Sequence, residues 1–120
     1  MKEAPIGTSL RKTFLTTPDM GTAHTGAAVL ATPAMIALME VASLEAVKPF
    51  LEEGEQTVGT MVHVWHRAAS KIGETVEVDA RLIERDRRKL LFEVKATCAG
   101  KLLGEGTHER FVIDARRFSA

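Results

Sequence analysis

Two hydrophobic patterns of different period share this chain, and their combination restricts the fold more than any other feature. The first lies in residues 31–47, ATPAMIALMEVASLEAV, which are mostly apolar. Thr32 followed by Pro33 is a helix-start signal, because threonine is a good N-cap and proline is tolerated at the first helical position. A helix is therefore expected from this point to about Val47, where KPFLEEGE ends it.

The second pattern has a period of two and follows the helix. It covers residues 57–66 (TVGTMVHVWH), 75–84 (TVEVDARLIE) and 89–98 (KLLFEVKATC). The side chains expected on the apolar faces are Val58, Val62, Val64 and His66, then Val76, Val78, Ala80 and Leu82, then Leu90, Phe92, Val94, Ala96 and Cys98. Those expected on the opposite face of the first segment are Gly59, Met61, His63 and Trp65. Such alternation predicts half-buried antiparallel strands joined by tight turns at RDRR and AGK.

Two further strands are expected near the ends of the chain. One spans residues 10–16 and leads into a loop, TTPDMGTAHTG, that reaches Gly26. The other, LLGEGTHERFVI, contains Gly104 and Gly106, which predict a bulge or a close backbone approach. The order is thus strand, helix and then four strands in a meander.

One helix cannot cover both faces of a five-stranded sheet, so the sheet is expected to wrap around the helix. The predicted fold class is α+β: a hotdog fold, with an antiparallel five-stranded sheet around one central helix. A length of 120 residues is enough for one such domain, residues 1–120, with one hydrophobic core.

Composition excludes several classes of partner. Sixteen basic and sixteen acidic residues cancel, which argues against a general nucleic-acid or anionic-membrane surface. The single Cys98 cannot form an intramolecular disulfide, and the sequence MKEAPIGTSL lacks the apolar run of a signal peptide. Pro33 and Glu40 interrupt the best candidate for a transmembrane segment. A cytoplasmic protein without nucleic-acid or membrane partners is expected.

Glu40 is the only formal charge between Met20 and Leu44 when histidine is counted as neutral. No basic residue stands one helical turn before or after it, so it has no ion-pair partner at helical spacing. Two interpretations stay open. Glu40 lies either on an exposed stripe of a partly covered helix or in a pocket, where it would act as base or nucleophile.

His66 shares its expected strand face with three valines, so it should point toward the helix; the alternative is a core histidine bonded to a backbone carbonyl. His63, an odd number of residues away, falls on the opposite face, so HVWH is not a metal-binding pair. Thr32, besides capping the helix, offers a hydroxyl and free backbone N–H groups at the positive helix end, where an oxyanion would be stabilised.

Other candidates are better explained structurally. Cys98 alternates with apolar residues and is expected to be a small buried hydrophobe. RDRRK, residues 85–89, is typical of a solvated hairpin tip, although clustered arginines could also hold a phosphate-bearing ligand. The chain contains no P-loop, dinucleotide fingerprint or zinc-ligand cluster, so neither a cofactor nor a metal is expected.

Three segments, ATPAMIALMEVAS, EEGEQTVGTMVHVWHRAAS and GEGTHERFVI, together resemble the hotdog-fold thioesterases similar to fluoroacetyl-CoA thioesterase. The resemblance covers roughly residues 10–118. In that family a threonine at the helix start, a glutamate eight residues later and a histidine twenty-six residues further form the catalytic set. Thr32, Glu40 and His66 stand at those spacings.

The resemblance also implies substrate-binding roles for Gly59, His108 and Arg110, and a homodimer or higher oligomer with acyl-CoA at the subunit interface. The CoA moiety is then part of the substrate and not a cofactor. Members specific for fluoroacetyl groups carry aromatic residues ahead of the threonine, whereas residues 26–30 here are GAAVL. The resemblance therefore does not assign the acyl group.

The activity implied is hydrolysis of a small acyl-CoA, or a related acyl thioester, to the free acid and thiol. Glu40 would attack the carbonyl or activate water, His66 would move protons, and Thr32 with nearby N–H groups would orient or stabilise the oxyanion. One alternative is a hotdog protein that binds acyl thioesters without turnover, as a sensor or carrier. Another is an acyl-CoA hydratase, which the lack of a paired Asp and His ahead of the helix disfavours.

Overall fold

The computed structural model describes residues 1–22 and 28–117. The elements, in chain order, are β1 (Ser9–Leu15), η1 (Pro18–Met20), α1 (Thr32–Val47), η3 (Lys48–Phe50), β2 (Glu55–His66), β3 (Thr75–Asp86), β4 (Lys89–Cys98) and β5 (Lys101–Asp114). The predicted order of strand, helix and four strands is confirmed. The end of the predicted loop, from residue 23 to Gly26, lies outside the described residues.

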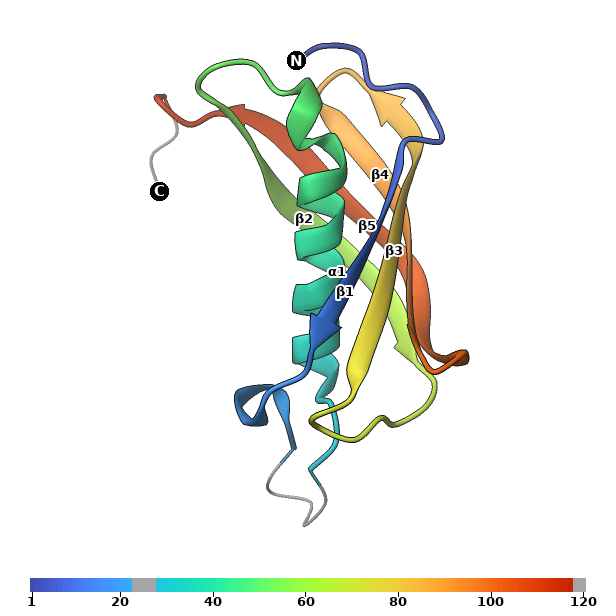
Figure 1. The fold of residues 1–120 in the computed structure, drawn as a ribbon. Coiled ribbons are helices and arrows are strands. Elements are labelled where there is room, and N and C mark those ends of the chain that lie inside the picture. Colours follow the sequence, from blue (N-terminus) through green and yellow to red (C-terminus); the bar gives the residue numbers. More distant parts are fainter. Residues whose placement is uncertain (23–27, 118–120) are drawn as a thin grey trace.

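The five strands form one antiparallel sheet in the order β1-β3-β4-β5-β2, and α1 lies lengthwise against one of its faces (Figure 1). The hotdog prediction is thereby confirmed, but the four-strand meander is wrong. Strands β3, β4 and β5 form a meander, whereas β2 pairs with β5 and lies at an edge. The segment between β2 and β3 is no tight turn: residues 67–74 cross the end of the molecule where α1 begins, and the N–H of Leu30 donates to the carbonyl of Ser70.

The core lies between α1 and the inner faces of the strands. The predicted inner faces of β3 and β4 are confirmed, because all nine of their predicted apolar side chains are buried. The side chains of α1 that pack against them are Met35, Leu38, Met39, Ala42, Ser43, Ala46 and Val47. Cys98 is buried as expected, and this burial raises the pKa of its thiol, which keeps the group unreactive.

Strand β2 departs from the predicted alternation at one point. Its pairing with β5 shifts register between Gly59 and Met61, so Thr60 is the extra residue of a β-bulge. A bulge reverses which face the residues before it occupy, and a Cβ at Gly59 would lie 3.1 Å from Oε2 of Glu40 on α1. Gly59 therefore faces the helix, and Val58, paired with the exposed Phe111, faces outward. The prediction for these two residues is wrong.

Beyond the bulge the predicted faces of β2 are correct, and its end packs tightly against its neighbours. Val62 pairs with the buried His108 on the helix side. A Cβ at Gly104 would lie 2.5 Å from the sulfur of Met35 and 2.8 Å from the carbonyl oxygen of Trp65. The predicted close backbone approach at this glycine is confirmed. In residues 1–22 and 28–117, no helix is both long and apolar enough to cross a membrane.

Candidate active site

Thr32 and His66 meet where α1 begins and β2 ends. The Thr32 Oγ1 and His66 Nδ1 atoms are 2.8 Å apart, a hydrogen-bond distance. Thr32 is the first helical residue, Ala31 occupies the N-cap, and no side-chain cap is made. The prediction of Thr32 as N-cap is therefore wrong: its hydroxyl bonds the imidazole of His66 instead of the helix backbone.

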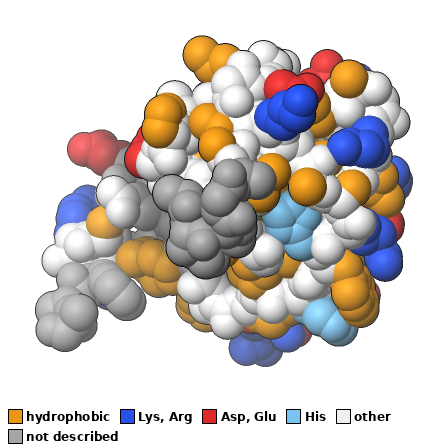
Figure 2. All heavy atoms as spheres, turned by 90° about the horizontal axis from the view of Figure 1, so that it is seen from below, with side chains coloured by type: hydrophobic (Ala, Val, Ile, Leu, Met, Phe, Trp, Pro, Cys, Tyr) orange, Lys and Arg blue, Asp and Glu red, His pale blue; other side chains and the backbone are white. Residues whose placement is uncertain are grey.

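The surroundings of this pair favour proton transfer and anion binding. The first N–H groups of a helix have no intrahelical partner, and the dipole makes this end positive. Among the described residues, Nε2 of His66 is buried and has no hydrogen-bond partner. The pair opens into a hollow of about 300 Å³ lined by Val29, Leu30, Thr32, His66, Arg67, Ala68 and Ala69. Figure 2 shows this end of the molecule, where histidine side chains reach the surface among hydrophobic ones.

Glu40 occupies a second cluster, further along α1. Its side chain is 41% exposed, and its Oε2 atom lies 3.7 Å from Nη1 of Arg110. The two residues line a hollow of about 300 Å³ together with Ala37, Val41 and Leu44. Both sequence interpretations are thus partly correct, since Glu40 stands on a partly covered stripe and also faces a hollow. Its cationic partner comes from β5, which helical spacing cannot reveal.

Arg110 is held from behind by two strands. Its Nε donates to the hydroxyl of Thr57 over 2.8 Å, and its Nη2 donates to the carbonyl oxygen of the same residue over 2.8 Å. Its Nη1 lies 3.1 Å from Nε2 of His108, whose Nδ1 lies 2.9 Å from the carbonyl oxygen of Met61. Burial, and then the Arg110 charge, lower the pKa of His108 below its ordinary value. Sequence reasoning missed Thr57, whose only signal is its position two residues before Gly59 on one strand face.

The structure does not bring the two clusters together within one chain. Eight residues of α1 separate Thr32 from Glu40, roughly 12 Å along the helix axis. Gly59, where a Cβ would lie 3.1 Å from Oε2 of Glu40, precedes His66 by seven residues, roughly 20 Å along β2. Of the predicted site residues, Thr32 is therefore joined with His66, whereas Glu40 is joined with Gly59, His108 and Arg110.

His63 lies outside both clusters. It is exposed, and its ring centroid lies 4.7 Å from that of Trp65. The prediction that it does not share a face with His66 is confirmed. Within the described part of the chain, no group of three or more His, Cys, Asp or Glu side chains is placed to hold a metal ion.

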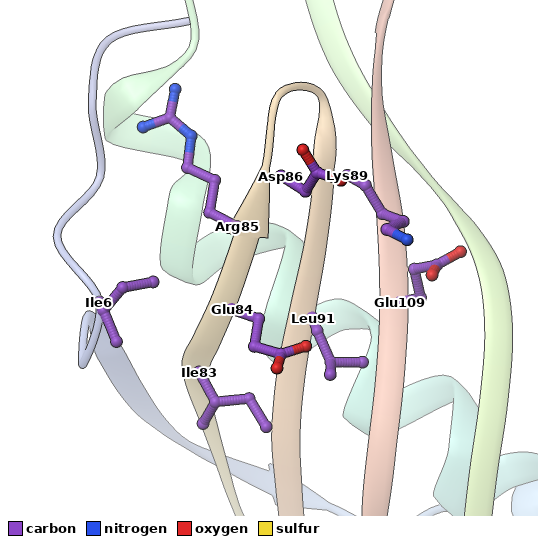
Figure 3. Close-up of a pocket in the computed structure, with 8 residues that line it drawn as sticks. All are labelled: Ile6, Ile83, Glu84, Arg85, Asp86, Lys89, Leu91 and Glu109. Carbon is purple, nitrogen blue, oxygen red and sulfur yellow. The ribbon is translucent and has the colours of Figure 1, made fainter.

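A hollow on the outer face of the sheet, near the hairpin of β3 and β4, contains none of the predicted site residues. It measures about 510 Å³ and is lined by Ile6, Ile83, Glu84, Arg85, Asp86, Lys89, Leu91 and Glu109. Figure 3 shows Arg85 and Lys89 pointing to opposite sides of the hairpin, with carboxylates between them. This mixture of charges fits a solvated hairpin tip better than a phosphate site.

Comparison with known proteins agrees with the resemblance seen in the sequence. The family model of fluoroacetyl-CoA-specific thioesterases matches residues 13–116. The fluoroacetyl-CoA thioesterase of Streptantibioticus cattleyicolor is 44% identical over 92 residues, and the match covers 77% of this chain but 66% of that protein, just under two thirds of its length.

Solved structures support the fold. The fluoroacetyl-CoA thioesterase FlK superposes with a TM-score of 0.91 at 34% identity, covering 98% of this chain and 93% of that one. A variant of that enzyme was solved in complex with fluoroacetate and CoA. A hot-dog-like protein from Thermanaerovibrio acidaminovorans has a TM-score of 0.82 at 20% identity, covers 97% of this chain and 94% of its own, and shows the shared fold.

Proposed function

Because this chain belongs to the family of fluoroacetyl-CoA-specific thioesterases, we propose that it hydrolyses a small acyl-CoA, or a related acyl thioester, at a site that two copies build together. The observation that carries the proposal is the contact between Thr32 and His66 at the positive end of α1. It places a hydroxyl, a ring nitrogen without a partner among the described residues and a helix N-terminus around one hollow.

Each group has a distinct part in the reaction. The Glu40 carboxylate attacks the thioester carbonyl or removes a proton from the attacking water. The negative charge that develops on the carbonyl oxygen is stabilised by the Thr32 hydroxyl and the first N–H groups of α1. As the carbon–sulfur bond breaks, His66 delivers a proton to the departing thiolate. If Glu40 attacks directly, water then hydrolyses the mixed anhydride between Glu40 and the acyl group and restores the carboxylate. In either case the products are the free acid and CoA.

The proposed site requires a homodimer, because one chain separates Glu40 from His66. Strand β2 is an edge strand, and large apolar side chains are exposed on it and on the helix beside it: Met61 and Val62 of β2 are 37% and 38% exposed, and Val41 of α1 is 40% exposed. Such an edge favours pairing with another strand. Antiparallel pairing of two β2 strands about a two-fold axis near Val62 would set Gly59 and Glu40 of one protomer beside His66 of the other.

The opposite edge of the sheet explains why β2 is the proposed interface. Strand β1 carries charged pairs, in which Arg11 contacts Asp79 at 2.7 Å and Lys12 contacts Glu45 at 2.7 Å. Charged side chains on an edge strand discourage pairing with another sheet. We therefore assign the dimer contact to β2 and the open face of α1.

The hollow beside Glu40 suits a small acyl group. Its walls are the side chains of Ala37, Val41 and Leu44, with one cation, Arg110, at its side. A larger hollow of about 530 Å³ continues from Leu44 toward Lys48 and Leu51, which leaves room for the rest of the thioester. A cytoplasmic location, where acyl-CoA is made and used, is part of the proposal.

Release of free thiol from a panel of acyl-CoAs tests the proposed function. The protein should hydrolyse acyl-CoAs with short acyl chains faster than those with long ones. Binding of acyl-CoA without thiol release would make the protein a sensor or carrier. Addition of water to an enoyl-CoA without thiol release would make it a hydratase.

A further inference from the structure

The partners of His108 determine where its proton lies. The carbonyl oxygen of Met61 can only accept, so Nδ1, at 2.9 Å, must carry the hydrogen. A guanidinium can only donate, so Nε2, at 3.1 Å from Nη1 of Arg110, must offer a lone pair. His108 is therefore the neutral Nδ1–H tautomer, as these two contacts alone require.

This ring completes the support of Arg110. Thr57 accepts from Nε and Nη2 and so holds one edge of the guanidinium. His108 holds the remaining nitrogen, Nη1, which is also the atom nearest to Glu40, at 3.7 Å from Oε2. A guanidinium held at all three nitrogens keeps one orientation, so its charge stays directed at the carboxylate.

His108 itself is removed from the hollow. It is 1% exposed, and the side chains around the hollow include Arg110 but not His108. A Cβ at Gly59 would lie 3.1 Å from Cε1 of His108, so the backbone of β2 covers the ring on that side.

We infer that His108 is a positioning residue: its Nε2 lone pair holds Nη1 of Arg110 against Glu40, and it acts on the substrate only through that guanidinium. This inference rests on the proposed function and moves the role expected for His108 from substrate contact to support of the residue beside the substrate. The lowered pKa of His108 agrees with a ring that stays neutral.

Two substitutions separate positioning from simple packing. Gln at position 108 keeps an oxygen acceptor near the place of Nε2, whereas Phe keeps a ring and removes the acceptor. His108→Phe should lower kcat/KM by about 10- to 100-fold, the range expected when a catalytic arrangement is slightly misplaced. His108→Gln should restore most of that loss. His63→Gln, an exposed histidine on the outer face of β2, is the matched control and should leave kcat/KM unchanged.

A double-mutant cycle shows whether the effect passes through Arg110. In an Arg110→Met background, His108→Phe should change kcat/KM by less than about twofold, because the group it positions is gone. The full His108→Phe loss in that background would overturn the inference and return His108 to direct substrate contact. Equal losses from Gln and Phe would also overturn it, because the acceptor would then be irrelevant.

The tautomer can be measured in the wild-type protein without relying on any variant's folding. The ¹⁵N shifts of the His108 ring at neutral pH should show a protonated Nδ1 and an unprotonated Nε2. A protonated Nε2 would overturn the inference, because that nitrogen could not then accept from Arg110. A wild-type protein that releases no thiol would overturn the proposed function instead, and the ring shifts would still decide whether His108 holds Arg110.

Discussion

The two clusters differ in how completely their polar groups are satisfied. At the start of α1, exposed Thr32 and half-buried His66 share one hydrogen bond, and among the described residues Nε2 of His66 has no partner. Beside Glu40, the buried Arg110 and His108 have partners at every side-chain nitrogen. A group that moves protons needs a donor or acceptor atom that is free to bond the substrate. A group that holds a charge in place needs a hydrogen-bond partner at each of its polar atoms. In the proposed mechanism, His66 of the first cluster therefore moves a proton, whereas Arg110 and His108 of the second cluster orient the reacting Glu40 carboxylate.

The greatest loss of turnover is expected from a substitution in the cluster of Thr32 and His66. His66→Ala should lower turnover roughly 10²- to 10⁴-fold, the usual loss for a general acid or base, while the protein stays folded. Steady-state kinetics and thermal melting measure the two properties. His63→Ala is the control and should be mild, because that side chain is exposed on the outer face. Similar losses from both substitutions would remove the distinction between the two strand faces.

Glu40→Gln should cause a comparable loss of turnover, at least about 10²-fold, because the amide can neither attack the carbonyl nor take a proton. Stability should change by less than about 0.5 kcal/mol, since the side chain is 41% exposed and its contact with Arg110 is 3.7 Å long. Substrate binding should largely survive, because the carboxylate acts in the transition state. Wild-type turnover by this variant would place Glu40 outside the reaction.

Helical and strand periodicity correctly predicted those elements whose apolar residues recur at the spacing of the face that the structure buries. The helix, the inner faces of β3 and β4 and the burial of Cys98 followed from spacing alone. The bulge at Thr60 could not be predicted, because it is a property of pairing with β5 and not of the residue. The partnership of Glu40 with Arg110 likewise joins positions 70 residues apart that only the sheet order brings together.

The proposed dimer contact can be broken by one substitution on β2. Val62→Asp places a carboxylate at the centre of the proposed β2 contact. Because burying an unpaired charge there is costly, the variant should be monomeric. Light scattering measures the mass, and activity should fall with the dimer fraction. Thr13→Asp on β1 is the control and should leave the mass unchanged. A fully active Val62→Asp monomer would contradict the shared site.

The smallest effect concerns the pH dependence of stability. The folded pKa of His108 lies below its ordinary value of about 6.5, so the folded state binds fewer protons than the unfolded state just below that pH. The stabilisation is complete above the unfolded pKa and is lost as the pH falls toward the folded pKa. Glu40, Glu109 and Arg110 are the charged groups facing the ring, and all remain in His108→Gln.

Melting temperatures between about pH 7.5 and pH 5 should therefore fall less in His108→Gln than in the wild type. The other histidines contribute equally to both proteins and cancel in the difference. An equal fall of the melting temperature in both proteins would mean that His108 titrates as it does in the unfolded chain. The neutral His108 ring that is inferred to hold Arg110 would then lose its support.

Complementation in a mixed dimer tests most directly whether one site is built by two chains. Chains carrying His66→Ala and chains carrying Glu40→Gln are expressed together with different affinity tags, and the mixed dimer is purified through both. One of its two sites then joins an intact Thr32 and His66 with an intact Glu40 from the other chain. About half of wild-type turnover is expected from this dimer, although each parent dimer is inactive. Activity no greater than that of the parents would contradict a site shared by two chains, because the reacting groups would then have to come from a single chain.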